Sequence, residues 1–198
     1  METTQAVSEL ARAQHTTVST VLQAAWSQIL MGLTGQRDVA FGTVVSGRPT
    51  DLPGADVIVG LMINTVPARA TVDADTTVAD LLEQLQITRN DTLEHQFLAL
   101  TDIHRATGHD ELFDTLFVYE NYPLDPGAFT GTATDLTITG FSIRERNHYP
   151  LTLAVLPGPQ LGLRFEYDTT QFTTKTITRL GQRFQRVLDV LTTTKQGE

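Results

Sequence analysis

The stretch Val59–Arg69 reads VGLMINTVPAR and decides how the chain is interpreted. It is an apolar run that an amide, a rigid turn residue and a guanidinium interrupt at Asn64, Pro67 and Arg69. Inside a strand core, Asn64 would leave several hydrogen-bonding groups to satisfy and Pro67 would remove a ladder donor. We therefore predict that a strand running to about Val72 enters or leaves its sheet here, at a functional edge.

The composition is sufficient for a hydrophobic core and argues against polyanionic binding partners. Its 198 residues are 40% hydrophobic, which suits one domain. The 14 Lys and Arg against 23 Asp and Glu give a formal net charge of -9 without any basic run, which argues against nucleic acid and anionic membranes as partners. The absence of cysteine excludes disulfides and a cysteine nucleophile. Residues 1–5 lack signal-peptide features and no window approaches about 20 apolar residues, so we expect a cytoplasmic protein.

Apolar residues recurring at the helical period predict four helices. They cover residues 4–14, Val18–Leu33, a segment from Val78 to as far as Phe97, and Thr174–Leu191. Thr16, Thr17 and Ser19 are candidate caps of the second helix, Gly32 or Gly35 its end, and Asp75, Thr76 and Thr77 candidate caps of the third.

Short apolar or alternating runs predict the strands. Asp38–Val45 is nearly all apolar, which is typical of a central strand covered on both faces. Further strands are expected at residues 59–72 and Leu112–Tyr119, followed by an antiparallel meander of Leu136–Ile143, Leu151–Leu156 and Leu161–Tyr167. The fold class is therefore α/β (α+β), with a mixed, partly antiparallel sheet and helices packed against it.

The side chains that could carry chemistry form no recognisable catalytic set. None of the five histidines has a His-x-x-x-Asp spacing, and no Gly-x-Ser-x-Gly elbow or phosphate-binding glycine loop is present. His104 and His109 are five residues apart, which places them on different faces of a helix, so a solvated loop is the better interpretation. We predict no catalytic residue and no metal ligand in this chain.

Four segments carry a resemblance to a known family. Gly60, Asn64, Thr65 and Arg69 match the pattern Gly-x-Phe-Val-Asn-Thr-x-x-x-Arg, with Met62 in place of Phe. Ser46–Pro49 reads SGRP, His95-Gln96 matches the start of a further motif, and Arg144–Leu151 keeps Arg144, Pro150 and Leu151 of Arg-Asp-x-Ser-Arg-Asn-Pro-Leu, with Glu145 in place of Asp. On these motifs the whole chain resembles the second half of nonribosomal peptide synthetase condensation domains. The segment Phe117–Pro123 favours the condensation branch over the epimerisation branch, which carries Phe-Asn-Tyr-Leu-Gly there.

The resemblance implies that residues 1–198 form one chloramphenicol acetyltransferase-like lobe, the C-terminal of two lobes that enclose a tunnel. Such a lobe supplies a wall, a floor near Ser46–Gly60 and a latch near Asn121–Thr134. The family's His-His-x-x-x-Asp-Gly motif belongs to the N-terminal lobe and is absent here, so the resemblance implies no activity for this chain alone. It implies no intrinsically bound cofactor. The expected partners are the N-terminal lobe, adjacent synthetase domains and peptidyl carrier protein domains, which deliver 4'-phosphopantetheine.

The same resemblance supplies two sets of candidate residues. Those expected in the substrate tunnel or at the lobe interface are Asn64, Arg69, Asn121, Arg144, Asn147 and His148. Those expected to maintain the motifs structurally are Gly47, Arg48, Pro49, Gly60, Thr65, Pro150 and Leu151. Structural alternatives stay open: Asn64 as a strand-end amide that satisfies backbone groups, Arg69 in a buried ion pair with a loop carboxylate, and Arg144 or Arg146 as an anchor of its loop.

Two other functions also stay open on the sequence alone. One is a non-catalytic module that recruits a carrier protein or a tailoring enzyme. The other is a complete small acyltransferase whose base is His148, which requires a cleft and a carboxylate behind the imidazole. A lobe without its partner exposes surface that it would otherwise bury, so we also expect self-association.

Overall fold

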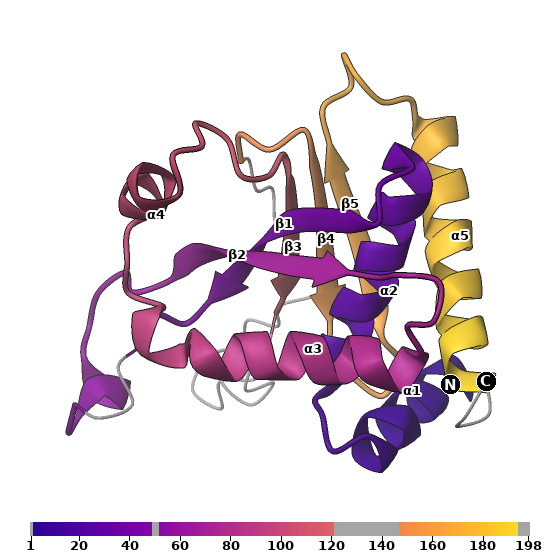
Figure 1. Ribbon diagram of the computed structural model, residues 1–198, viewed down its shortest axis with the longest axis horizontal. Helices are drawn as coiled ribbons and strands as arrows, with labels where there is room; N and C mark the ends of the chain where they lie inside the picture. The colour runs from indigo at the N-terminus through magenta and orange to yellow at the C-terminus, as the bar shows by residue number, and fades with distance from the viewer. Residues whose placement is uncertain (1, 49–51, 121–146, 194–198) are drawn as a thin grey trace, which may run out of the picture.

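The computed structural model describes residues 2–48, 52–120 and 147–193, which build a five-stranded sheet and the helices that pack on it (Figure 1). The helices are α1 (Glu2–Ala13), α2 (Val18–Thr34), α3 (Val78–Asp91), α4 (Leu100–Thr107) and α5 (Thr174–Thr193), with short 3-10 turns η1 (Ala55–Val57) and η2 (Leu93–His95). The strands are β1 (Asp38–Val45), β2 (Asn64–Thr71), β3 (Thr115–Tyr119), β4 (Leu151–Leu156) and β5 (Gly162–Tyr167).

The sheet is mixed, which confirms the predicted fold class. Its strand order is β2-β1-β3-β4-β5. The inner pairs β1–β3 and β3–β4 are parallel, and the outer pairs β1–β2 and β4–β5 are antiparallel. The antiparallel pairing predicted for Leu151–Leu156 with Leu161–Tyr167 is confirmed, while the predicted strand Leu136–Ile143 lies outside the described residues.

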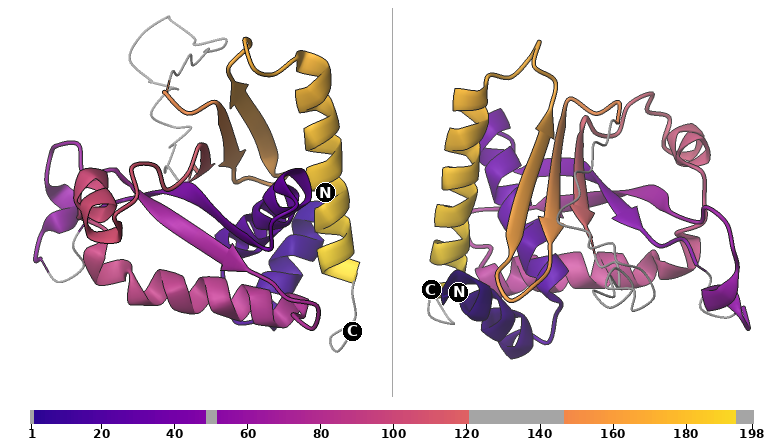
Figure 2. Two further views of the ribbon diagram at one scale, coloured as in Figure 1. Left: turned by 45° about the horizontal axis from the view of Figure 1, so that its top comes forward. Right: turned by 180° about the vertical axis from the view of Figure 1, so that it is seen from behind.

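The pairing register separates the two faces of the sheet. Val39 and Phe41 of β1 share a face with Leu153 of β4 and Phe165 of β5, and this face packs against α2, α3 and α5, while α1 packs on α2 and α5 (Figure 2). Helix α4 stands apart from α5, at the other side of the molecule in Figure 1. As predicted, β1 is an interior strand. However, the described helices cover only one of its faces, and Ala40 on the other face is half-buried.

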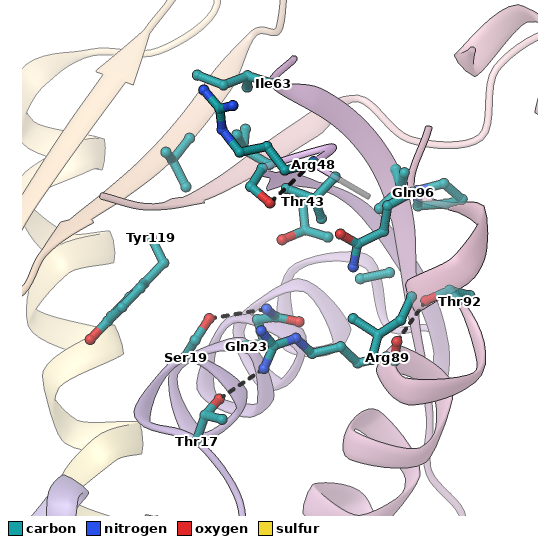
Figure 3. Close-up of a pocket in the computed structure, with 18 of the residues that line it drawn as sticks. Thr17, Ser19, Gln23, Thr43, Arg48, Ile63, Arg89, Thr92, Gln96 and Tyr119 are labelled. Atoms are coloured by element: carbon teal, nitrogen blue, oxygen red, sulfur yellow. Dashed lines mark hydrogen bonds between the residues drawn. The ribbon is translucent and has the colours of Figure 1, made fainter. Parts of the chain in front are cut away.

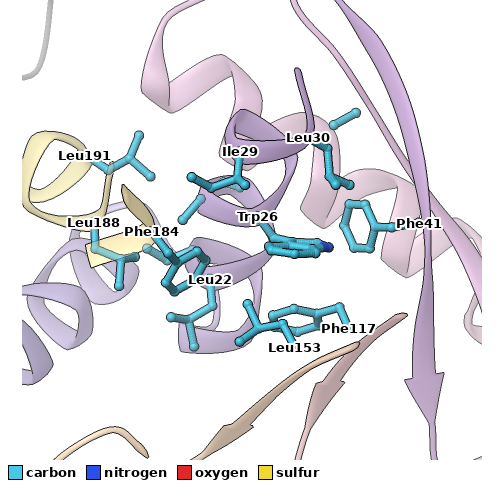
Figure 4. Close-up of a cluster of buried hydrophobic side chains, with 14 of the residues drawn as sticks. Leu22, Trp26, Ile29, Leu30, Phe41, Phe117, Leu153, Phe184, Leu188 and Leu191 are labelled. Atoms are coloured by element: carbon cyan, nitrogen blue, oxygen red, sulfur yellow. The ribbon is translucent and has the colours of Figure 1, made fainter. Parts of the chain in front are cut away.

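Aromatic side chains form the centre of the core (Figure 4). Trp26 of α2 is fully buried, and its ring meets that of Phe184 from α5 edge to face, with centroids 6.4 Å apart. Phe41 and Phe117 make a second edge-to-face pair, at 6.3 Å, on the sheet side of Trp26. Such pairs add specific geometry to the burial of a large apolar area. The amphipathic faces of α2 and α5 therefore meet the sheet around a single indole.

The predicted helix boundaries hold where a capping residue marks them. Thr17 caps α2 by accepting a hydrogen bond from the Thr20 amide, and Gly35 ends it in the left-handed conformation. At the start of α3, Thr77 and Asp80 form a capping box. The possible extension of this helix to Phe97 is wrong, because α3 ends at Asp91 and the chain tightens into η2.

Three further boundaries differ from the sequence prediction. Helix α4 was not predicted, because its eight residues contain too few apolar side chains to define a period. Strand β3 begins at Thr115 rather than Leu112, and β2 begins at Asn64 rather than Val59. Pro67 lies inside β2, opposite Gly42, and not at a strand end. It is tolerated there because β2 is an edge strand.

Candidate functional site

A cavity of about 1100 Å³ opens where the first turns of α2, the last turns of α3 and the strands β1, β2 and β3 come together (Figure 3). Its lining combines apolar side chains of the sheet with hydroxyl, amide and guanidinium groups from the helices. A concave, mainly apolar site with a few convergent polar groups is the usual form of a ligand pocket. The segment Gly60–Ile63, from the stretch that decided the sequence interpretation, forms one of its edges.

Gly47 and Arg48 fix this edge of the cavity. Gly47 has a φ of 61°, and a Cβ atom there would lie 1.9 Å from the carbonyl oxygen of Met62. The Arg48 guanidinium donates hydrogen bonds to the carbonyl oxygens of Ala55 and Ile58 and contacts the Met62 sulfur at 3.5 Å. Both residues thus hold the loop after β1 against the segment before β2, whereas Pro49 lies outside the described residues.

Asn64 joins the start of β2 to the segment that follows η2. Its Nδ2 donates to the carbonyl oxygens of Gln96 at 2.8 Å and Leu98 at 2.7 Å, while its Oδ1 accepts from the Thr65 amide at 2.9 Å. This is the arrangement that the structural alternative describes, a strand-end amide that satisfies backbone groups. Asn64 is not among the residues that line the cavity, so its expected contact with substrate stays a prediction.

Replacing Asn64 by alanine is expected to lower the free energy of unfolding by about 1–2 kcal/mol, because two carbonyl groups lose their donor. The loss falls on α4, which has no buried residue to hold it in place. Hydrogen exchange should therefore accelerate most at residues 93–107. The matched control is Asn90→Ala, which removes only an exposed bond to Gln86 on the surface of α3. Equal hydrogen-exchange rates at residues 93–107 in both variants would show that the hydrogen bonds of Asn64 to Gln96 and Leu98 do not stabilise this segment.

Arg69 forms a bidentate ion pair with Asp38 across the β1–β2 ladder. Its Nη2 and Nε lie 2.6 Å and 2.9 Å from the two carboxylate oxygens. The hydrogen bond from the guanidinium lowers the pKa of Asp38 and raises that of Arg69. The sequence alternative, a buried ion pair with a loop carboxylate, is right about the ion pair and wrong about its surroundings. Asp38 belongs to strand β1, and the side chains of Arg69 and Asp38 are 68% and 52% exposed. Such a pair contributes little to stability.

The motif segment before β4 divides into structural and exposed residues. Asn147 donates to the Thr152 hydroxyl at 3.0 Å and to Glu166 at 3.3 Å, and it accepts from the Tyr149 amide. His148 is exposed and stacks on the ring of Tyr149, with centroids 4.1 Å apart. Burial raises the pKa of Tyr149. The carbonyl of Pro150 accepts from the Asp168 amide, and Leu151 opens β4.

No carboxylate of the described residues forms an ion pair or a hydrogen bond with His148. Within that part of the chain, the acid needed behind a histidine base is therefore lacking. The candidates Asn121 and Arg144, together with Glu145 and Arg146, lie outside the described residues. The part of the chain that the structure describes contains no group of three or more potential metal ligands, and among its helices there is none with both the length and the apolar character to cross a membrane.

Several residues that line the cavity were not predicted as site residues from the sequence. They come from α2, α3 and the end of β3 and include Thr17, Ser19, Gln23, Arg89, Tyr119 and Glu120. No motif links them, because they lie up to a hundred residues apart and meet only when the helices pack. Burial raises the pKa of Tyr119. Glu120 is held by Arg164, whose Nη2 lies 2.6 Å from its carboxylate.

Comparison with known proteins decides the family. The model of the condensation domain matches residues 1–197. The chain belongs to the condensation domain family. Among curated relatives of this condensation-domain chain, chondramide synthase cmdD of Chondromyces crocatus is 41% identical over 179 residues, covering 89% of this chain and 4% of the relative. Surfactin synthase subunit 3 of Bacillus subtilis (strain 168) is 37% identical over 178 residues, covering 89% of this chain and 14% of that protein.

Solved structures show the same condensation-domain fold. The first condensation domain of the CDA synthetase superposes with a TM-score of 0.77 at 22% identity, covering 96% of this chain and 42% of that one. A holo four-domain nonribosomal peptide synthetase bound to AMP and glycine gives a TM-score of 0.82 at 18% identity. The match covers 96% of this chain and 16% of that structure's chain. The chain therefore spans less than half the length of these solved structures and a small fraction of the curated synthetases.

An exposed apolar surface borders the cavity of this condensation-domain chain. Its apolar side chains come from two segments, which the bonds of Asn64 to Gln96 and Leu98 link. They are Val57, Ile58, Val59, Leu61 and Ile63 from the first, and Leu93, Phe97 and Leu98 from the second. Val59 is 100% exposed, Leu61 88% and Phe97 69%. Contiguous exposed apolar patches mark interaction sites more often than plain surface. The surface and the cavity meet at Leu61, Ile63 and Leu93.

Proposed function

We propose that the chain is the C-terminal lobe of a nonribosomal peptide synthetase condensation domain. It forms a wall, floor and latch of the tunnel in which carrier-bound aminoacyl and peptidyl thioesters are joined by amide-bond formation. The observation that carries the proposal is the open cavity edged by the Gly60–Ile63 segment of the family motif. The exposed apolar surface beside the cavity supports the proposal, because a partner lobe would cover it in the joined domain. The coverage of 42% of a solved condensation domain agrees with a lobe.

The N-terminal lobe is the partner proposed for the exposed apolar surface. In the joined domain, the acceptor amine attacks the carbonyl of the donor thioester, the new amide forms, and the thiol of the donor arm leaves. A base near the attacking amine has to come from the His-His-x-x-x-Asp-Gly segment of that lobe, because His148 has no carboxylate partner among the described residues. This chain contributes walls and positioning. Its site of action is then the cytoplasm, beside adjacent synthetase domains and carrier proteins.

The cavity is large enough for the arms that such carriers bring. Its apolar part, from Val45, Val66 and Leu85, suits the uncharged portion of a 4'-phosphopantetheine arm, and its hydroxyl and amide groups suit the amides of that arm. The arm arrives with the substrate, so the chain needs no resident cofactor.

Complementation tests the proposal. The chain is mixed with the N-terminal lobe of a relative's condensation domain and with two loaded carrier proteins, and the carrier-bound product is measured by mass spectrometry. We expect no product from the chain alone, and product once a complex with the N-terminal lobe forms. Product from the pure chain contradicts the half-enzyme proposal. A carrier complex that forms without the N-terminal lobe and stays inactive with it favours a recruitment module instead.

The chain without its partner lobe is expected to self-associate through the exposed apolar surface. Light scattering over a hundredfold concentration range should show the average mass rising with concentration. Replacing Val59 and Leu61 by serine should reduce that rise, since both side chains are almost fully exposed and their loss costs little folding energy. A constant monomeric mass for the unaltered chain would contradict a large interface.

A further inference from the structure

Among the described residues, three guanidinium groups line the cavity, those of Arg48, Arg69 and Arg89, and the Arg89 side chain is the one with the weakest contact. Arg48 donates to the carbonyl oxygens of Ala55 and Ile58, and Arg69 is paired with Asp38. Arg89 of α3 makes a single long contact, from Nη1 to the Thr17 hydroxyl at 3.4 Å. Within the described ranges, no carboxylate lies within ion-pair distance of Arg89.

The surroundings of Arg89 supply hydrogen-bond donors and little negative charge. Figure 3 shows the side chain reaching from α3 across the cavity to the start of α2, where its guanidinium end lies beside Thr17 and Gln23. Ser19 lies next to Gln23, which donates to the serine hydroxyl at 3.3 Å. Among the described residues that line the cavity, Glu120 is the sole carboxylate, and it pairs with Arg164, which also pairs with Glu166. The described lining therefore holds three guanidinium groups and one carboxylate.

A guanidinium held by a weak contact at the edge of such a cavity suits a phosphate group. Arginine recognises phosphate through several parallel N–H donors, and hydrogen bonds between two charged groups are the strongest of their kind. A ligand with one phosphate and an otherwise uncharged body fits both the cation and the apolar lining. The negative charge of the ligand would replace the single neutral partner that Arg89 has now.

We propose that Arg89 binds the phosphate of the carrier-borne 4'-phosphopantetheine arm and so sets how far the arm enters the cavity. This inference rests on the proposed function, because it takes the arm from there. It adds a recognition residue that lies outside the family motifs, near the end of α3. Thr17, Ser19 and Gln23 supply neutral groups around the same phosphate.

Binding of three probes to the ¹⁵N-labelled chain tests the proposal by NMR titration. The probes are 4'-phosphopantetheine, pantetheine, which lacks the phosphate, and inorganic phosphate. We expect 4'-phosphopantetheine to shift the amides of residues 17–23 and 85–92 and to bind about tenfold more weakly to Arg89→Gln, the scale of one exposed charge-assisted bond. Binding of pantetheine should stay unchanged. Arg89→Lys should recover part of the loss, because it restores the charge without the planar donors.

The control is Arg105→Gln, which removes another exposed arginine, one that is paired with Asp102 on α4 and does not line the cavity. It should bind all three probes as the unaltered chain does. Equal affinity of Arg89→Gln and the unaltered chain for 4'-phosphopantetheine would overturn the role of Arg89 while leaving the proposed function intact. Binding of inorganic phosphate without 4'-phosphopantetheine would make this a free-anion site and overturn the assignment to the arm. Binding of neither pantetheine nor 4'-phosphopantetheine would count against both proposals.

Discussion

Replacing Trp26 by alanine is expected to lower the free energy of unfolding by about 3–5 kcal/mol, the usual cost of truncating a large aromatic side chain in a core. The indole is fully buried between Phe184 of α5 and the aromatic pair on the sheet, so alanine leaves a void that four elements would have to fill. The free energy of unfolding of a single domain is only about 5–15 kcal/mol in total. The variant should therefore unfold at a much lower urea concentration.

Circular dichroism is the appropriate measurement, because Trp26 is the single tryptophan of the chain and its fluorescence is lost with it. The control is Leu33→Ala on the same helix, where the side chain is 55% exposed and the expected change is within about 0.5 kcal/mol. Trp26→Phe should cost less than Trp26→Ala, since the indole nitrogen has no hydrogen-bond partner in the described structure. A loss below about 1 kcal/mol for Trp26→Ala would contradict the central position given to this ring.

Local chemistry explains why much of the fold could be predicted from the sequence. The bounds of β1 were predicted to the residue, because Asp38 and the β-branched pair Val44-Val45 delimit an apolar run. Along β5 the alternation of Leu163, Phe165 and Tyr167 with charged residues predicted which side chains face the core. The packing confirms this for Phe165 and Tyr167, whereas Leu163, near the start of the strand, is exposed. Helix caps and the alternation of strand residues involve only a few neighbouring residues, so both can be recognised in the sequence.

The rest depends on contacts between distant segments. Pro67 suggested a strand end, but the position of β2 at the edge of the sheet lets a proline occupy its middle. Helix α4 has no buried residue, and the segment just before it is bonded to the Asn64 side chain through the carbonyl oxygens of Gln96 and Leu98. Arg89 became a candidate only when α3 packed beside α2, since nothing in its own neighbourhood in the sequence marks it. Residues of this kind require coordinates.

Replacing Gly47 by alanine is expected to disturb both stability and function, because two separate constraints act at this residue. Its φ of 61° lies in the left-handed region, which costs a residue with a Cβ atom about 1–2 kcal/mol. The added Cβ would also lie 1.9 Å from the Met62 carbonyl oxygen, a backbone atom that no rotamer change can move away. We expect a total loss of about 3 kcal/mol or more, or a displacement of residues 58–63 that relieves the clash.

A second glycine separates the two constraints. Gly35 has a φ of 71°, but nothing lies within 4 Å of the position its Cβ would take, so Gly35→Ala carries only the conformational cost. In urea unfolding, the Gly47→Ala variant should therefore have a much lower free energy of unfolding than the Gly35→Ala variant. In the complementation assay, Gly47→Ala should lose at least tenfold in product formation, since residues 58–63 belong to both the cavity edge and the exposed apolar surface. Gly35→Ala, at the far end of α2, should keep it. If the two variants behave alike in both measurements, the contact between Gly47 and Met62 does not position residues 58–63, and other residues set this edge of the cavity.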